Sequence, residues 1–127
     1  MRLLLDTHVF LFAIGVHGAL SERIRALLMD PAVERSVSAV SRWEIGIKVQ
    51  VGKLDLPLDR EFYETHVRAL KAKVLPVEFA HSVEMLSLPM HHRDPFDRML
   101  IAQARAEGLT VVTRDAAFGM YEVPVVW

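Results

Sequence analysis

Short candidate strands alternate with longer stretches of helical periodicity along the whole chain, and this alternation limits the fold more than any other feature. Arg2–Leu5 is typical of a buried strand, and further candidate strands lie at Arg35–Ser38, Lys73–Val77, Leu109–Thr113 and Val123–Val126. Strands that alternate with helices favour a parallel sheet covered by helices on both faces. The sequence therefore predicts a doubly wound α/β fold.

The stretches between these strands carry the start and stop signals of helices. The expected helices cover about Val9–Ile14, Ser21–Met29, Ala39–Val51, Leu58–Lys71, Ala80–Leu88 and Asp94–Glu107, with a turn or short helix at Ala116–Met120. The last long helix has the clearest signals. Asp94 can cap it, Pro95 suits its first turn, and Gly108 suits the left-handed position after its end.

Helical spacing also predicts which side chains face inward. The apolar positions are Val40, Trp43, Ile47 and Val51 in one stretch and Phe62, Val67 and Leu70 in the next. We expect these stripes to pack against the rest of the domain, or against a partner helix in the case of Trp43.

Length and composition limit the class of protein. A chain of 127 residues is expected to form one domain over residues 1–127, and 52% hydrophobic with 24% charged residues is typical of a globular protein. Because the net charge is −1, any nucleic acid must be held by a local basic patch or a metal. The absence of cysteine fits a reducing cytoplasm. No apolar run approaches the length that a membrane span needs.

Four acidic residues stand inside or at the end of apolar segments, where packing disfavours charge. Asp6 and Asp115 follow predicted strands, Glu44 lies on the apolar face of a helix, and Asp97 lies at the start of another. Buried carboxylates are rare unless paired or bound to a metal. Asp6 and Asp115 become neighbours if their strands are adjacent, because ligands of doubly wound sheets bind beyond the carboxyl ends of the strands. Four gathered carboxylates repel one another, and a divalent cation would offset that repulsion.

Each of these acids has an alternative role at a helix terminus. Asp6 and Asp115 could each cap the following helix, and Glu44 could form a capping box with Ser41. Asp97 could stabilise the first turn of its helix, a role that can coexist with metal binding because such a side chain also projects past the helix end. Two acids placed after buried strands favour a shared site over separate caps.

The segments around these acids resemble those of the PIN-domain ribonucleases. They are Leu5-Asp6-Thr7-His8, Ser38-x-x-Ser41-x-Trp43-Glu44-Ile45, Arg93-Asp94-Pro95-Phe96-Asp97-Arg98-Met99-Leu100-Ile101-Ala102-Gln103-Ala104 and Thr113-Arg114-Asp115. The four segments occur in register, and the resemblance covers essentially the whole chain. More narrowly, the chain resembles the small VapC-like toxins of prokaryotic type II toxin–antitoxin modules.

The resemblance implies a PIN-like three-layer α/β/α fold with a mostly parallel sheet of order 3-2-1-4-5. It implies an endoribonuclease toxin in which Asp6, Glu44, Asp97 and Asp115 hold Mg²⁺ or Mn²⁺ and are catalytic, so that metal-activated water cleaves tRNA, rRNA or mRNA. The implied partners are a VapB-like antitoxin, the RNA and a second copy of the chain, in the cytoplasm and without a membrane. Two alternatives stay open, a PIN fold that binds partners without catalysis and a PIN nuclease of RNA processing.

Further residues are expected to support the site or to contact substrate. They are Asp94, Thr113, Arg114 and His8. We interpret Asp94 as a cap rather than as a ligand. Basic residues that could offset phosphate charge at the rim are Arg42, Lys48, Arg93, Arg98 and Arg114. His91 and His92 are expected to be exposed loop residues, because adjacent histidines rarely converge on one ion.

Two other enzyme classes with clustered aspartates fit less well. A phospho-acceptor signalling domain would need a lysine after a late strand, where this chain has Thr113-Arg114-Asp115. A phosphatase of the haloacid-dehalogenase type would need a second aspartate two residues after Asp6, where His8 stands.

Overall fold

The computed structural model describes residues 1–127 and contains one five-stranded sheet in which all neighbouring strands are parallel. The strand order β3-β2-β1-β4-β5 confirms both the predicted α/β fold and the order that the resemblance implies. The strands are β1 (Arg2–Leu5), β2 (Glu34–Ser38), β3 (Ala72–Leu75), β4 (Thr110–Val112) and β5 (Val125–Val126).

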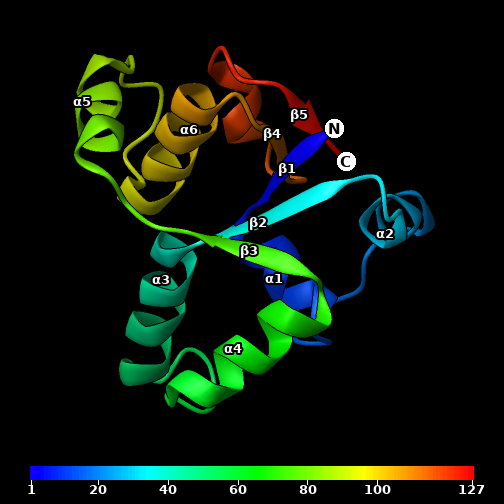
Figure 1. Cartoon of the computed structure of the whole chain (residues 1–127). Helices are drawn as coiled ribbons and strands as arrows, with labels where there is room; N and C mark the ends of the chain where they lie inside the picture. Colours follow the sequence, from blue (N-terminus) through cyan, green and yellow to red (C-terminus); the bar gives the residue numbers. More distant parts are fainter.

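Helices cover both faces of the sheet. They are α1 (Thr7–Ala13), α2 (Glu22–Met29), α3 (Ala39–Gln50), α4 (Arg60–Ala69), α5 (Phe79–Ser87), α6 (Pro95–Glu107) and the 3₁₀ helix η1 (Ala116–Met120). Figure 1 shows α5 and α6 on one side of the sheet and α1, α2 and α4 on the other. None of the helices combines the length and the apolar character that crossing a bilayer requires.

Alternation along β1 divides the core into two clusters. Leu3 and Leu5 pack with residues of α1 and α2, such as Ile24, whereas Leu4 points to the other face and packs with Leu100 of α6. All three leucines of β1 are at most 1% exposed. The strand is buried on both faces, which explains its unbroken apolar run.

The carboxyl ends of β1 and β4 lie side by side at the centre of the sheet. Leu5 pairs with Val112, and the backbone N–H of Asp6 donates to the carbonyl of Val112 at 3.1 Å. From β1 the sheet extends through β2 on one side and through β4 on the other, so the strand order reverses here. Ligands of doubly wound sheets bind in the crevice at such a point.

The predicted inward face of α3 is partly wrong. Trp43 is 63% exposed and Val51 is 62% exposed. Trp43 packs edge-on against Phe96, with ring centroids 5.1 Å apart, instead of entering the core. The residues of α3 that are buried are Val40, Ser41, Glu44 and Ile45. The helix therefore turns a partly polar face inward, which includes Val40 and Glu44 as predicted but not Trp43 or Val51.

The predicted inward face of α4 is confirmed, because Phe62, Val67 and Leu70 are partly buried and pack against the core. The buried residue is Tyr63, while Phe62 is only partly buried. The Phe62 and Tyr63 rings meet edge-to-face, with centroids 5.2 Å apart.

Candidate functional site

The acidic residues singled out in the sequence are brought together at the carboxyl ends of β1 and β4. The clearest sign is the pKa of Asp97, which is raised to about 7. Burial is the largest cause, and the rest comes from the negative charges of Asp94, Glu44, Asp115 and Asp6, in decreasing order. Asp97 therefore lies within electrostatic reach of all the other acids, although they come from four separate parts of the chain.

Asp6 is the N-cap of α1 and is only 3% exposed. Its Oδ1 accepts a hydrogen bond from the backbone N–H of Val9 at 2.7 Å. Burial raises the pKa of Asp6, and Asp115 adds to the rise. A hydrogen bond with the Thr113 side chain, the Val9 amide and the charge of His8 act in the opposite direction. The side chain is thus fixed on one oxygen by its own helix.

Glu44 is 5% exposed, and its neighbours offset its charge. The hydroxyl of Thr7 donates to Oε1 at 2.7 Å and lies 3.0 Å from Oγ of Ser41. Oε2 pairs with Nζ of Lys48 at 3.0 Å. These contacts join α3 to the start of α1, so Glu44 is held near Asp6. The alternative capping box is not formed, because α3 begins at Ala39 with Ser38 as its N-cap.

Asp97 has fewer compensating contacts than Glu44. Its side chain is 17% exposed, and Oδ2 lies 3.3 Å from Nε2 of His92. Asp94 caps α6 as predicted, since its Oδ1 accepts from the backbone N–H groups of Phe96 and Asp97 at 2.9 and 3.2 Å. The cap places a second negative charge beside Asp97. The arrangement makes Asp97 harder to ionise than an ordinary aspartate, and a bound cation would act in the opposite direction.

Asp115 is exposed and lies at the rim of the cluster. Its Oδ1 accepts from the backbone N–H of Ala117 at 2.9 Å, so Asp115 also caps η1. Its own N–H donates to Oγ1 of Thr113 at 3.0 Å. Thr113 is 1% exposed and contacts both Asp6 and Asp115. The hydroxyl of Thr113 therefore links the two acids that follow β1 and β4.

The donor set of this cluster fits a hard divalent cation by its chemistry. No three histidine or acidic side chains have a geometry that could hold a single metal ion. Asp6 and Asp115 each use one oxygen for a cap, and Glu44 uses both of its oxygens in contacts with Thr7 and Lys48. All the donors are carboxylates, which Mg²⁺ and Mn²⁺ prefer. A cation would also relieve the repulsion that raises the pKa of Asp97.

The surroundings of His92 and Arg98 differ from those predicted. His92 is partly buried, with Nδ1 2.7 Å from the hydroxyl of Tyr121 and Nε2 facing Asp97. Its sequence position in a loop gave no sign of this role. Arg98 is 8% exposed, and its guanidinium donates to backbone carbonyls such as that of Pro89 at 2.8 Å. Arg98 is therefore a structural residue and not part of a basic rim.

Of the other predicted supporting residues, His8 and Arg114 are exposed beside the cluster. The guanidinium of Arg114 lies over the ring of Phe12 at 4.8 Å from its centroid, and the ring of His8 lies 6.4 Å from the same centroid. Two residues that were not predicted are Thr7 and Ser41, whose hydroxyls contact each other and position Glu44.

Comparison with known proteins identifies a family. A family model described as PIN domain matches residues 3–123. A comparison with curated proteins gave no match. Among solved structures, VapBC2 from Rickettsia felis bound to a promoter DNA fragment matches with a TM-score of 0.73 and 16% identity, over 100% of this chain and 99% of that chain.

Two further structures match over nearly the whole chain. DNA-bound VapBC from Salmonella typhimurium has a TM-score of 0.71 at 17% identity, covering 99% of this chain and 97% of that chain. FitAcB from Neisseria gonorrhoeae has a TM-score of 0.63 at 23% identity, covering 98% and 96%. At these identities the likeness establishes a common fold.

Proposed function

The chain belongs to the PIN-domain family, and on that premise we propose that it is an endoribonuclease that depends on Mg²⁺ or Mn²⁺. The proposed metal ligands and catalytic residues are Asp6, Glu44, Asp97 and Asp115. One observation supports this assignment most. Asp97 is largely buried beside four other acids, and its burial together with their negative charges raises its pKa to about 7. Strongly perturbed groups of this kind concentrate at functional sites.

The protein groups around the acids would prepare the site for an ion. When bound, the cation would activate water and stabilise the charge that develops on the phosphate. Thr113 holds Asp6 beside Asp115, and Thr7 with Lys48 holds Glu44. His92 and the Asp94 cap fix the first turn of α6 and hence Asp97. Asp97 would lose its remaining proton when the cation binds.

We further propose that the protein is the toxin of a type II toxin–antitoxin module, with a VapB-like antitoxin as partner and cellular RNA in the cytoplasm as substrate. The structural neighbours include VapBC and FitAB assemblies, which supports this role. A PIN nuclease of RNA processing would have the same site. A partner-binding protein without catalysis is less favoured, because the chain keeps all four acids.

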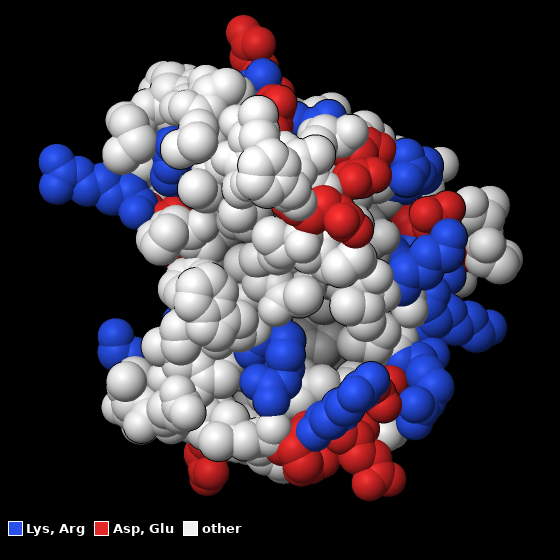
Figure 2. Space-filling view, turned by 60° about the vertical axis from the view of Figure 1, so that its left-hand side comes forward, with Lys and Arg blue, Asp and Glu red and all other residues white.

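The apolar surface of α5 supports a second copy of the chain as a partner. Phe79, Val83 and Leu86 are 86%, 55% and 82% exposed and follow helical spacing, so they form one stripe. Figure 2 shows a broad area without charged side chains where α5 and α3 come forward. Exposed apolar patches of this kind mark protein interfaces. Sedimentation should show a dimer that Leu86→Glu converts to monomer, while Met29→Glu, at an exposed site on α2, does not.

The nuclease assignment is tested with purified protein and end-labelled single-stranded RNA. Cleavage should require Mg²⁺ or Mn²⁺, stop in EDTA and leave a 5′-phosphate. Asp6→Asn should abolish both cleavage and growth arrest on expression, with an unchanged circular dichroism spectrum. Equal activity of Asp6→Asn and the wild type would overturn the assignment. Cleavage without growth arrest would favour an RNA-processing role.

A further inference from the structure

A basic groove lies beside the acidic cluster, along the exposed side of α1. Its volume is about 330 Å³, and its lining includes no acidic residue. The cationic and histidine side chains in it are His8, His17, Lys48, Lys53 and Arg114. For a chain whose net charge is −1, this is a local concentration of positive charge.

Three lining residues place the groove beside the acidic cluster. Lys48 forms the ion pair with Glu44, Arg114 directly precedes Asp115, and the charge of His8 acts on Asp6. From this end the groove follows α1 toward the loop that holds His17. A strand that leaves the acidic cluster on this side would pass over these side chains.

The positive charges of the groove are mostly free. Lys53 and Arg114 form no ion pair, and both are exposed. Arg114 is nevertheless held in place, because its guanidinium packs on the Phe12 ring. That ring is fixed from behind, since a Cβ at Gly18 would lie only 2.6 Å from it. A fixed, unpaired cation loses little entropy when an anion binds.

We propose that this groove binds the phosphodiester backbone of single-stranded RNA next to the cleaved bond, with Lys53 and Arg114 each contacting a phosphate. The identity of the ligand rests on the proposed function, whereas the groove and its charge do not. Contacts to phosphate position a nucleic acid without reading its sequence. The groove would thus set where the strand lies relative to the acids, not which bases are chosen.

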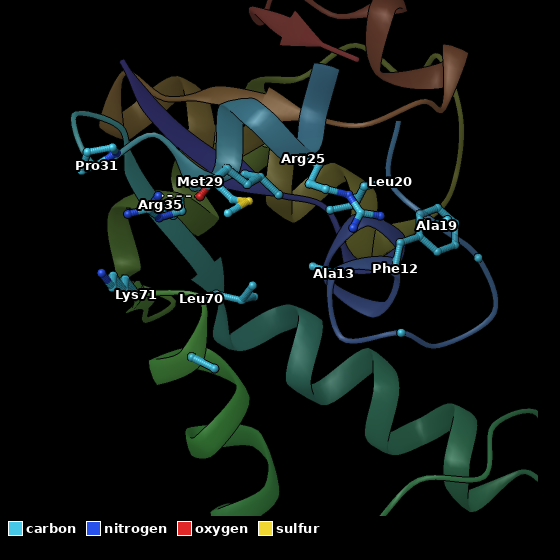
Figure 3. A pocket seen from close by; sticks show the side chains of 14 residues that line it. Phe12, Ala13, Ala19, Leu20, Arg25, Met29, Pro31, Arg35, Leu70 and Lys71 are labelled. Carbon is cyan, nitrogen blue, oxygen red and sulfur yellow. Dashed lines mark hydrogen bonds between the residues drawn. The ribbon is translucent and has the colours of Figure 1, made fainter. Parts of the chain in front are cut away.

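A second cavity provides the matched control. It has a volume of about 520 Å³, and Figure 3 shows that Arg25, Arg35 and Lys71 are among the residues lining it. Arg35 lies near the start of β2, and Lys71 immediately precedes β3. Because the strands are parallel, this cavity is at the end of the sheet opposite the acids. Arg25 and Lys71 are also exposed and form no ion pair.

The test measures binding of fluorescein-labelled single-stranded RNA by anisotropy, in EDTA so that no cleavage occurs, over a series of salt concentrations. For single strands, log K falls with log[salt] by about 0.7 for each phosphate contact. Lys53→Gln and Arg114→Gln should each reduce the slope by about 0.7, and the double variant by about 1.4. Arg114→Lys, which keeps the charge, should retain the slope. Arg25→Gln and Lys71→Gln should leave it unchanged.

Equal salt slopes for the wild type and the double variant would contradict the proposal that the groove binds RNA. An equal reduction of the slope in Arg25→Gln and Lys71→Gln would contradict it too. Tighter binding of single-stranded DNA of the same sequence would overturn RNA as the ligand. With Mg²⁺ present, the double variant should raise KM for RNA cleavage and leave kcat nearly unchanged. Slope changes as expected without any metal-dependent cleavage would leave the groove standing and remove the nuclease function. Metal-dependent cleavage with an unchanged KM in the double variant would support the nuclease function and contradict RNA binding in the groove.

Discussion

Asp97 and Arg98 are consecutive residues in the first turn of α6, and both charges are largely removed from water, yet their surroundings differ. The guanidinium of Arg98 donates to the Pro89 carbonyl at 2.8 Å and to the Tyr121 hydroxyl at 3.1 Å, with two more carbonyls at 3.4 Å. Asp97 has only His92 at 3.3 Å, and like charges surround it. The surroundings of Arg98 stabilise its charge, whereas those of Asp97 destabilise its charge.

The difference separates structural from functional burial of charge. A buried charge whose hydrogen bonds are satisfied holds elements together, as Arg98 joins α6 to the α5–α6 loop and to Tyr121. A buried charge left among like charges destabilises the fold, and such groups concentrate at functional sites. If this interpretation is right, substitutions at the two positions will affect different properties.

The largest expected effect is on catalysis. Asp97→Asn should lower the rate of metal-dependent RNA cleavage by about a thousandfold, because the bound ion supplies several kcal/mol of transition-state stabilisation. Arg98→Lys should stay within about tenfold of the wild type, since it keeps the charge outside the acidic cluster. Asp55→Asn, at an exposed acid that does not contribute to the pKa of Asp97, is the control. Near-normal cleavage by Asp97→Asn would remove the distinction between the two positions.

Next in size is the loss of stability at Arg98. Arg98→Met should reduce the free energy of unfolding by about 3 kcal/mol, because several buried carbonyls and the Tyr121 hydroxyl lose their donor. Arg98→Lys should lose less, since one ammonium can still reach some of these acceptors. Urea unfolding at neutral pH measures both. A loss below about 1 kcal/mol for Arg98→Met would show that the arginine is not structural.

Asp97→Asn should change stability in the opposite direction. The folded pKa of Asp97 is about 7 against an ordinary 3.8, so the folded state binds its proton more tightly than the unfolded state does. The resulting destabilisation is absent below about pH 4, grows as the pH rises to about 7 and is complete above that. Allowing for the partial exposure of the group, removing the charge should stabilise the metal-free protein by about 2 kcal/mol at pH 8.

Urea unfolding in EDTA at pH 5 and pH 8 checks this prediction. The gain from Asp97→Asn should be larger at pH 8 than at pH 5, with Asp55→Asn showing no such gain. A variant less stable than the wild type at pH 8 would mean that the negative charge is compensated in the folded protein.

Much of the fold was accessible from the sequence, because periodicity and caps are local properties. All five strands were predicted, and the Asp94 cap and the Gly108 C-cap are formed. The inward face of α3 was predicted only in part, because the apolar stripe of the sequence runs through Trp43, which is exposed. The buried face does include Val40 and Glu44, as predicted, but it also carries Ser41, and contact with Thr7 of α1 helps to make the burial of these polar groups favourable.

The acids of the candidate site could be predicted from the sequence, but the contacts that support them could not. Asp6 and Asp115 follow strands, which is a signal within the sequence. His92 beside Asp97 depends on the position of Tyr121, which lies 29 residues away in the chain. Long-range contacts of this kind leave no local pattern. The metal-binding role of the four acids stays a prediction.

The smallest expected effect is the stabilisation of the folded protein by Mg²⁺. It tests most directly whether a bound cation offsets the destabilising repulsion around Asp97. An ion that binds only the folded state stabilises it by about 1.4 kcal/mol when its concentration is ten times Kd. At pH 8 this should raise the Tm of the wild type by a few degrees and that of Arg98→Lys equally. Asp97→Asn should start from a higher Tm in EDTA and gain little from Mg²⁺. If Mg²⁺ raised the Tm of Asp97→Asn as much as that of the wild type, the cation would bind elsewhere, and the repulsion around Asp97 would have no metal to balance it.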